Sequence, residues 1–312
     1  MTELRPLIVL SGFLGSGKTT LLRRALDSPT AAGTAVLVNE IGEIGLDQHR
    51  FTQLAERTVL LDSGCLCCSS RADVVDALRE LVELEEAGRG PRVRRVVLET
   101  SGLADPRPVI ATLERDPLLA HRFTAGSVIV TCDAEHAAAH AALPEWQSQV
   151  AAAHVVVITK ADRADPKTAH ALVQRRNPAA QLIDAVEVDL CAAPLRASAA
   201  PIGGQAYDHH HATGVSTAHA VVERPIDPAL MYVWLSALLH AHGAALLRVK
   251  ALLDTGSEEE GPLVLDAVQH TVYPPQHLDR WEHPRRSSMV VIARGLDARK
   301  VTDAFRCQTV PA

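Results

Sequence analysis

One stretch near the start of the chain reads Gly12-Phe13-Leu14-Gly15-Ser16-Gly17-Lys18-Thr19, which matches the phosphate-binding P-loop pattern G-x-x-x-x-G-K-[ST]. An apolar run over residues 6–10 precedes it, and a helical pattern over residues 20–26 follows it. Glycines let backbone N–H groups approach a polyphosphate closely, and the N-terminus of the following helix adds a partial positive charge. The stretch therefore predicts a nucleotide site between a strand and a helix.

The positions of this loop have separate predicted tasks. Lys18 brings a full charge to the terminal phosphates and takes part in catalysis, while the Thr19 hydroxyl can ligate Mg²⁺. The other nucleotide-binding positions that we predict from the loop are Gly12, Gly15, Ser16, Gly17 and Thr20.

The composition and charge of the chain argue against nucleic-acid and membrane partners. The chain has 312 residues and a net charge of −6 with no basic block, which argues against a nucleic-acid partner because phosphate backbones require clustered Lys and Arg. No stretch reaches the ~18 apolar residues of a membrane span, so no membrane partner is expected. We recognise no export signal, and we expect a cytoplasmic protein whose thiols stay reduced.

Short apolar runs alternate with amphipathic helical stretches over the first 192 residues. Several of these runs are continuous rather than alternating, which suits strands buried on both faces of a parallel sheet. We predict strands at 7–10, 35–38, 59–61, 93–99, 127–131 and 155–159, and helices at 20–26, 72–86, 106–113 and 166–176. The predicted fold class is α/β, a P-loop NTPase domain with a doubly wound, mostly parallel sheet.

The pattern changes beyond residue 192. Residues 193–215 are rich in Ala, Pro, Gly and His without a period, which predicts a linker between a P-loop domain at 1–192 and a second domain at 216–312. In the second domain we predict strands at 218–222, 245–249, 263–268 and 288–293, and helices at 228–240 and 297–305. This order predicts a smaller C-terminal α+β domain.

A P-loop NTPase needs an acidic group at the end of a neighbouring strand, and the apolar run that ends in Glu99 provides one. Glu99 would hold the water shell of Mg²⁺ or position the attacking water, and the Gly102 N–H could bond the γ-phosphate. A late strand then leads into Thr159-Lys160-Ala161-Asp162, which is similar to the base-recognition pattern N-K-x-D. Lys160 can lie over a purine face and Asp162 can accept both N–H groups of a guanine edge, although Thr159 in place of asparagine leaves the strictness of guanine selection open.

Three of the six cysteines, Cys65, Cys67 and Cys68, stand within four residues. Thiolates select Zn²⁺ and other soft or borderline metals, so the cluster predicts a metal site, with buried structural cysteines and a redox dithiol as alternatives. An acidic loop at 39–47 follows the second predicted strand, and Glu40 or Glu43 could complete the metal site. The histidine tract at 208–211 could capture metal loosely.

Taken together, these motifs resemble the CobW-type metallochaperone GTPases, relatives of the urease and hydrogenase accessory GTPases. The resemblance covers nearly the whole chain and includes the stretches at 12–20, 39–47, 64–68, 99–106, 159–162 and 245–250. It implies GTP hydrolysis with Mg²⁺, coupled to delivery of Zn²⁺ or Co²⁺ to a client metalloprotein, with Cys65, Cys67 and Cys68 as metal ligands. The long His-rich loop of that family is reduced here to a short tract.

Two other function classes remain open at this point. A small-molecule kinase would use the same P-loop but would need an acceptor site and an arginine-rich lid, and no such lid is obvious in the sequence. A metal-binding protein with a vestigial nucleotide site is less consistent with intact Lys18, Thr19 and Glu99. A second copy of the chain is considered as a partner beside the client, since either could accelerate slow intrinsic turnover.

Overall fold

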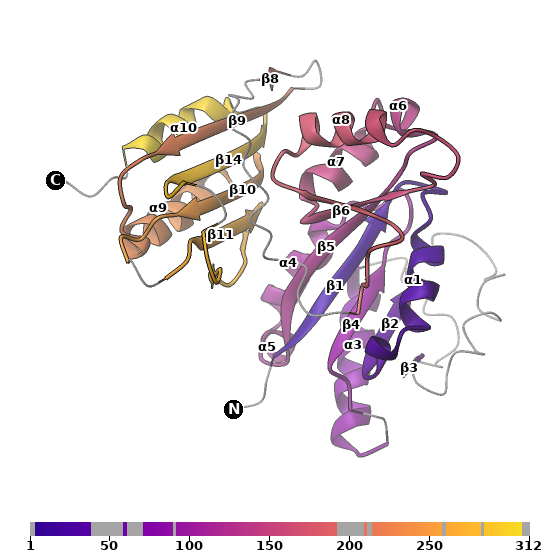
Figure 1. Cartoon of the computed structure of the whole chain (residues 1–312). Helices are drawn as coiled ribbons and strands as arrows, with labels where there is room; N and C mark the ends of the chain where they lie inside the picture. Colours follow the sequence, from indigo (N-terminus) through magenta and orange to yellow (C-terminus); the bar gives the residue numbers. More distant parts are fainter. Residues whose placement is uncertain are drawn as a thin grey trace. The chain divides into compact units, whose positions relative to one another are not determined.

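A computed structural model describes residues 4–38, 59–60, 71–89, 92–191, 209–210, 214–257, 260–281 and 284–307. The chain forms two compact units, one of residues 1–170 with 182–196 and the other of residues 171–181 with 197–312. Each unit is built around its own sheet (Figure 1). None of the helices in the described ranges has the length and apolar character needed to cross a bilayer.

The first unit contains a seven-stranded sheet in the order β3-β2-β4-β1-β5-β6-β7. Its strands are β1 (Arg5–Gly12), β2 (Thr34–Val38), β3 (Val59–Leu60), β4 (Arg95–Glu99), β5 (Phe123–Asp133), β6 (Val155–Thr159) and β7 (Gln181–Asp184). The registered pairs from β3 across to β6 are all parallel, and β4, β5 and β6 consist almost entirely of buried residues. The predicted doubly wound parallel sheet is therefore confirmed.

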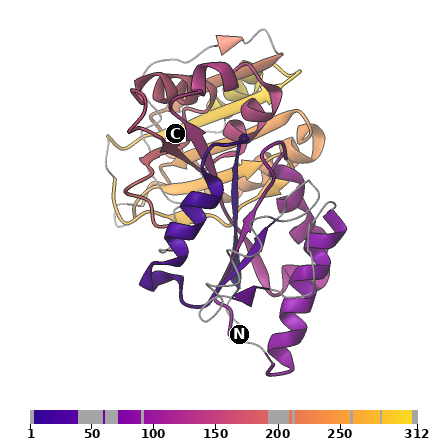
Figure 2. The ribbon, with the colours of Figure 1, turned by 90° about the vertical axis from the view of Figure 1, so that its right-hand side faces the viewer.

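Helices cover both faces of this sheet. They are α1 (Lys18–Leu26), α3 (Arg71–Glu86), α4 (Arg107–Arg115), α5 (Pro117–Ala120), α6 (Ala137–His140) and α7 (Pro144–Ala152), with a short 3₁₀ turn at Pro29–Ala31. A further helix, α8 (Lys167–Arg176), spans the boundary between the two units in the sequence. The apolar side of α1 packs through Leu21 and Leu22 on Ile8, Leu10 and Val97. Figure 2 shows α1 on one side of the sheet and α3 on the other.

The register gathers four carboxyl strand ends at one edge of the sheet. Leu10 of β1 pairs with Glu99 of β4, and Gly12 of β1 pairs with Thr131 of β5. Asp133 at the end of β5 in turn lies opposite Thr159 at the end of β6. Ligands of open α/β sheets bind outside such strand ends, so this edge is where a site is expected.

The second unit has an antiparallel sheet in the order β12-β11-β10-β14-β9-β8, with β13 beside β11. Its strands are β8 (His209–His210), β9 (Val215–Val222), β10 (Leu246–Leu253), β11 (Leu263–Val268), β12 (Thr271–Val272), β13 (Gln276–His277) and β14 (Ser287–Arg294). Helices α9 (Pro228–His242) and α10 (Ala298–Arg306) bury Met231, Leu235 and Phe305 in one cluster with alternate residues of β10 and β14, such as Val249 and Val291. Both helices therefore cover the same face, and the predicted α+β arrangement is confirmed.

Several elements differ from the sequence-based prediction. Helix α7 was not predicted, because its sequence PEWQSQVAA buries Ser148 and Gln149 along with its apolar residues and so lacks a clear apolar stripe. Strand β5 is longer than the predicted 127–131: it begins at Phe123 and continues through Asp133.

Candidate functional site

The P-loop closes tightly on itself between β1 and α1. Ser16 Oγ donates to the Phe13 carbonyl at 2.6 Å and also lies 2.6 Å from Thr131 Oγ1 on β5. Gly12 has φ +141°, and a Cβ added there would come within 2.2 Å of that Thr131 hydroxyl, so only glycine fits. Gly15 and Gly17 also have positive φ, while Thr20 is exposed on the first turn of α1.

Lys18 folds back over the loop and is 9% exposed. Its Nζ donates to the carbonyl oxygens of Gly12 at 3.0 Å and Phe13 at 3.2 Å. Carbonyl oxygens carry only partial negative charge, so a phosphate would be a stronger partner for this ammonium group.

Thr19 and Glu99 meet beside Lys18. The Thr19 hydroxyl donates to Glu99 Oε1 at 2.6 Å, although the two residues are separated by 80 positions in the sequence. Glu99 is buried at the end of β4, and the adjacent Thr100 N–H donates to the Leu10 carbonyl of β1 at 2.9 Å. A hydroxyl and a carboxylate at this distance form an oxygen donor set that Mg²⁺ accepts.

Gly102 lies directly against the P-loop. A Cβ added at Gly102 would approach the Leu14 backbone nitrogen to 2.7 Å, so the close contact of the two loops depends on glycine. Buried Gln149 of α7 donates its amide to the carbonyls of Gly102 at 3.0 Å and Ala104 at 3.1 Å. Gln149 was not predicted, because nothing in the sequence indicates that α7 reaches this loop.

Thr159 links the end of β6 to the P-loop. Its hydroxyl donates to the Ser16 carbonyl at 2.7 Å and lies 3.3 Å from the Cys132 carbonyl. The side chain at the position of the expected asparagine thus fastens the loop at 159–162 to the phosphate loop.

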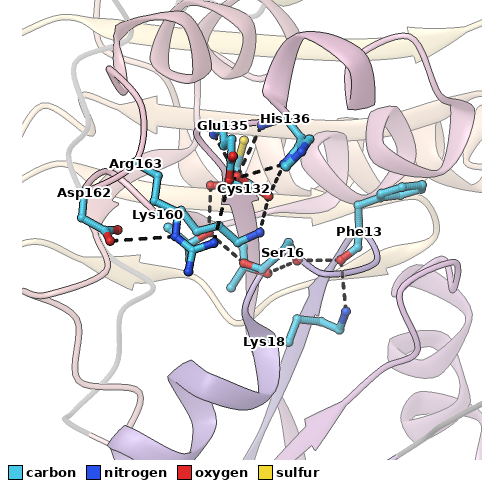
Figure 3. A network of polar contacts seen from close by, with 12 residues as sticks. Phe13, Ser16, Lys18, Cys132, Glu135, His136, Lys160, Asp162 and Arg163 are labelled. Atoms are coloured by element: carbon cyan, nitrogen blue, oxygen red, sulfur yellow. Dashed lines mark hydrogen bonds and ion pairs between the residues drawn. The ribbon is translucent and has the colours of Figure 1, made fainter.

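The two remaining base-site candidates differ in their surroundings (Figure 3). Lys160 has φ +57° and places Nζ 2.6 Å from Asp133 Oδ2, whereas the Asp162 side chain is 80% exposed. Burial would raise the pKa of Asp133, but hydrogen bonds from Lys160, His136 and the Glu135 N–H outweigh burial and hold this pKa below its ordinary value. Asp133 is therefore a carboxylate at neutral pH, directly beside a predicted nucleotide-binding lysine.

Asp133 was missed by the sequence analysis, although a signal was present. It ends an apolar strand in the same way as Glu99 ends β4. Its position beside the P-loop strand follows from the strand order, which places β5 between β1 and β6.

The predicted metal ligands Cys65, Cys67, Cys68 and Glu40 lie outside the described residues, as do the loop at 39–47 and residues 208 and 211 of the histidine tract. The cysteines in the described part are Cys132, Cys191 and Cys307. Burial raises the pKa of Cys132 to about 12 and also raises that of Cys191, so both remain neutral thiols that are poorly suited to hold a metal.

Two family descriptions match this chain. Residues 6–184 match "CobW/HypB/UreG, nucleotide-binding domain", and residues 215–308 match "Cobalamin synthesis protein cobW C-terminal domain". The chain belongs to the CobW/HypB/UreG family. The predicted family is thus confirmed, and the P-loop edge described above lies within the matched nucleotide-binding domain.

Curated relatives share about a third of their aligned residues with the chain. The zinc chaperone YjiA of Escherichia coli is 35% identical over 184 residues, which is 58% of this chain and 58% of the relative. The zinc chaperone CobW of Pseudomonas aeruginosa is 34% identical over 192 residues, 51% of this chain and 50% of the relative. The chain thus spans little more than half the length of these relatives.

The fold also matches a solved structure over its full length. The crystal structure of Zn(II)-bound YjiA GTPase from E. coli superposes with a TM-score of 0.66 at 24% identity, covering 99% of this chain and 100% of that one. At this identity the likeness establishes the two-domain fold alone.

Proposed function

We propose that this chain is a GTPase that couples the binding of GTP and Mg²⁺ to the handling of a thiolate-bound metal ion, which it delivers to a client metalloprotein. The observation that carries the nucleotide part is the contact at 2.6 Å between Thr19 and Glu99 beside the buried Lys18. Lys18 and Thr19 begin helix α1, which follows β1, and Glu99 ends the adjacent strand β4, so three groups suited to a magnesium triphosphate belong to one edge of the sheet.

The chain's own residues divide the work of hydrolysis. Thr19 and Glu99 would hold Mg²⁺, which supplies charge neutralisation to the phosphates when bound. Lys18 and the backbone N–H groups of the P-loop stabilise the charge that develops on the γ-phosphate, and the Gly102 N–H contacts that phosphate. Loss of the γ-phosphate would remove its bond to the Gly102 N–H, next to Leu14 of the P-loop.

Guanine recognition is assigned to the loop that follows β6. Lys160 would cover the face of the base, and the exposed Asp162 would accept the N–H groups of its edge. Gly12, Gly15, Ser16, Gly17 and Thr20 complete the proposed nucleotide site.

The metal part rests on the cysteine cluster at Cys65, Cys67 and Cys68, with Glu40 as a further ligand. Two relatives carry the words zinc chaperone in their names, which supports zinc as the metal, with cobalt as the alternative. We retain the domain limits 1–192, 193–215 and 216–312 and a cytoplasmic location as proposals, and the family matches ending at 184 and starting at 215 support the limits.

The nucleotide proposal is tested by GTP turnover of the wild type and of Lys18→Ala. We expect slow magnesium-dependent release of phosphate by the wild type and none by the variant. Transfer of phosphate to a metabolite without any effect of metal would instead indicate a kinase, and absence of nucleotide binding would indicate a vestigial site. A dependence of the specific rate on protein concentration would identify a second copy of the chain as an activator.

The metal proposal is tested by zinc titration with a non-hydrolysable GTP analogue, with GDP and without nucleotide. We expect Cys67→Ser to abolish tight zinc binding and to leave nucleotide binding intact, while Cys307→Ser, which changes an exposed cysteine elsewhere, has no effect. A zinc affinity that is equal in all three nucleotide states would remove the coupling and leave the GTPase.

A further inference from the structure

A polar network centred on Asp133 lies where β5 and β6 end. Asp133 Oδ1 accepts the backbone N–H groups of Glu135 at 2.8 Å and His136 at 3.4 Å. Its Oδ2 accepts the Lys160 ammonium at 2.6 Å and lies 3.0 Å from His136 Nδ1. The Asp133 side chain is 1% exposed, so this carboxylate has a fixed position.

Lys160 is consequently fixed at both of its ends. Its backbone adopts a left-handed conformation directly after Thr159, whose hydroxyl is bonded to the P-loop, and its ammonium group is bonded to Asp133. A free lysine side chain loses up to about 2 kcal/mol of rotamer entropy when it is ordered. A lysine that is already held loses less of this entropy when a ligand settles on its stem.

We propose that Asp133 is the positioning residue of the base site, holding Lys160 so that the alkyl stem of this lysine forms the platform on which the purine ring rests. The inference rests on the proposed guanine-nucleotide function and extends it by one residue. Asp133 acts through Lys160 and does not itself touch the nucleotide.

The same network reaches the phosphate half of the site. The His136 ring stacks on His140 with centroids 5.7 Å apart, and the His140 ring packs 4.6 Å from that of Phe13 in the P-loop. Burial lowers the pKa of His140, so a neutral imidazole packs on this phenyl ring at pH 7. Base loop and phosphate loop are thereby connected through Asp133 as well as through Thr159.

A metal site is the other arrangement that these residues suggest, because the ligand atoms of Asp133, Glu135 and His136 lie within 4.8 Å of one another. Both Asp133 oxygens already accept hydrogen bonds, one of them from the Lys160 ammonium. A cation bound there would have to displace a positive charge, which favours the positioning role.

The test compares two carboxylates with the same local chemistry. Asp116 also accepts two backbone N–H groups on Oδ1 and a cation on Oδ2, in its case Arg79 at 2.6 Å. In Asp133→Asn and Asp116→Asn the amide oxygen can keep the backbone hydrogen bonds, and each variant loses the charge that holds its cation. Affinities for GDP and for inosine diphosphate are measured by calorimetry, with circular dichroism as the check on folding.

We expect Asp133→Asn to weaken the binding of both nucleotides about tenfold and Asp116→Asn to leave both unchanged. The wild-type preference for GDP over inosine diphosphate should persist in Asp133→Asn, because that preference comes from Asp162 reading the 2-amino group. Adding Asp133→Asn to Lys160→Gln should cause no further loss, since the carboxylate acts through the lysine.

Three results would overturn the inference while leaving the GTPase in place. They are unchanged affinity in Asp133→Asn, a loss of the GDP preference together with affinity, and additive effects in the double variant. A wild-type chain that binds neither nucleotide would overturn the proposed function and this inference with it.

Discussion

The buried Lys250 should destabilise the folded protein while its side chain is charged. It lies on β10, is 4% exposed, and stands opposite Asp266 of β11, which is already paired with Arg248 at 2.6 Å. One carboxylate thus serves two cations, and the hydrogen bond from Lys250 Nζ to the Ala179 carbonyl at 3.1 Å adds no negative charge. Burial lowers the pKa of Lys250 to about 8, with attraction to Asp266 opposing this and repulsion from Arg248 adding to it.

The size of the effect follows from this pKa. The fall from the ordinary value of 10.5 to about 8 corresponds to about 3 kcal/mol of destabilisation while the lysine is charged. Lys250→Met removes this cost and leaves the Ala179 carbonyl without that donor, which costs about 1 kcal/mol. At neutral pH the free energy of unfolding of Lys250→Met should therefore be about 2 kcal/mol higher than that of the wild type.

The sign of the pH dependence is set by linkage. Below about pH 8 Lys250 is protonated in both the folded and the unfolded chain, so the charged lysine destabilises the folded wild type to its full extent. Between about pH 8 and 10.5 only the unfolded chain holds it, so the unfolding free energy of the wild type rises with pH. The advantage of Lys250→Met should consequently shrink by about 2 kcal/mol between about pH 7.5 and about pH 9.5.

Urea unfolding monitored by tryptophan fluorescence measures this difference. A Trp146→Phe background restricts the signal to Trp234 and Trp281 in the second unit. Lys300→Met, which removes an exposed lysine from the same unit, is the control for the loss of one positive charge. A difference between Lys250→Met and the wild type that stays constant with pH would refute the reasoning.

Two further substitutions test packing and charge. Gly12→Ala should cost about 1–3 kcal/mol more than Gly15→Ala in urea unfolding without nucleotide, because both glycines have positive φ but only Gly12 faces atoms that a methyl group would strike. Equal losses of unfolding free energy in the two variants would mean that backbone strain, and not the clash of the added methyl group, causes the destabilisation. Arg248→Met should destabilise the second unit by about 3–5 kcal/mol because it separates the buried Asp266 from its 2.6 Å partner. In thermal unfolding, adding both Asp266→Asn and Lys250→Met should recover part of the loss, because the buried carboxylate and the lysine that it attracts are then both removed. No recovery in this triple variant would show that the lost packing of Arg248, rather than the charge, is responsible.

The sequence predicted those features that depend on local pattern. The P-loop, the strand that ends in Glu99 and the continuous apolar runs predicted a parallel sheet, and the fold and family are confirmed. They also predicted a site at the strand ends, which stays a prediction. Asp133 could not be predicted in this way, because its contacts depend on which strands are neighbours in the sheet. Gln149 could not be predicted because it lies on α7, a helix without a clear apolar stripe. Predictions for the cysteine cluster fall outside the described residues and stay predictions.

The hydrogen bond from Thr159 to Ser16 has a consequence for the synthesis of this protein. It joins residues 143 positions apart, and Lys160, the proposed platform, follows Thr159 where β5 and β6 are paired. A ribosome that has released only the first half of the chain has therefore exposed the P-loop without residues 159–162. Under the proposed function, full affinity for a nucleotide would arise only after residue 162 has emerged from the exit tunnel, so the ligand would stabilise the finished domain without guiding its earliest folding steps.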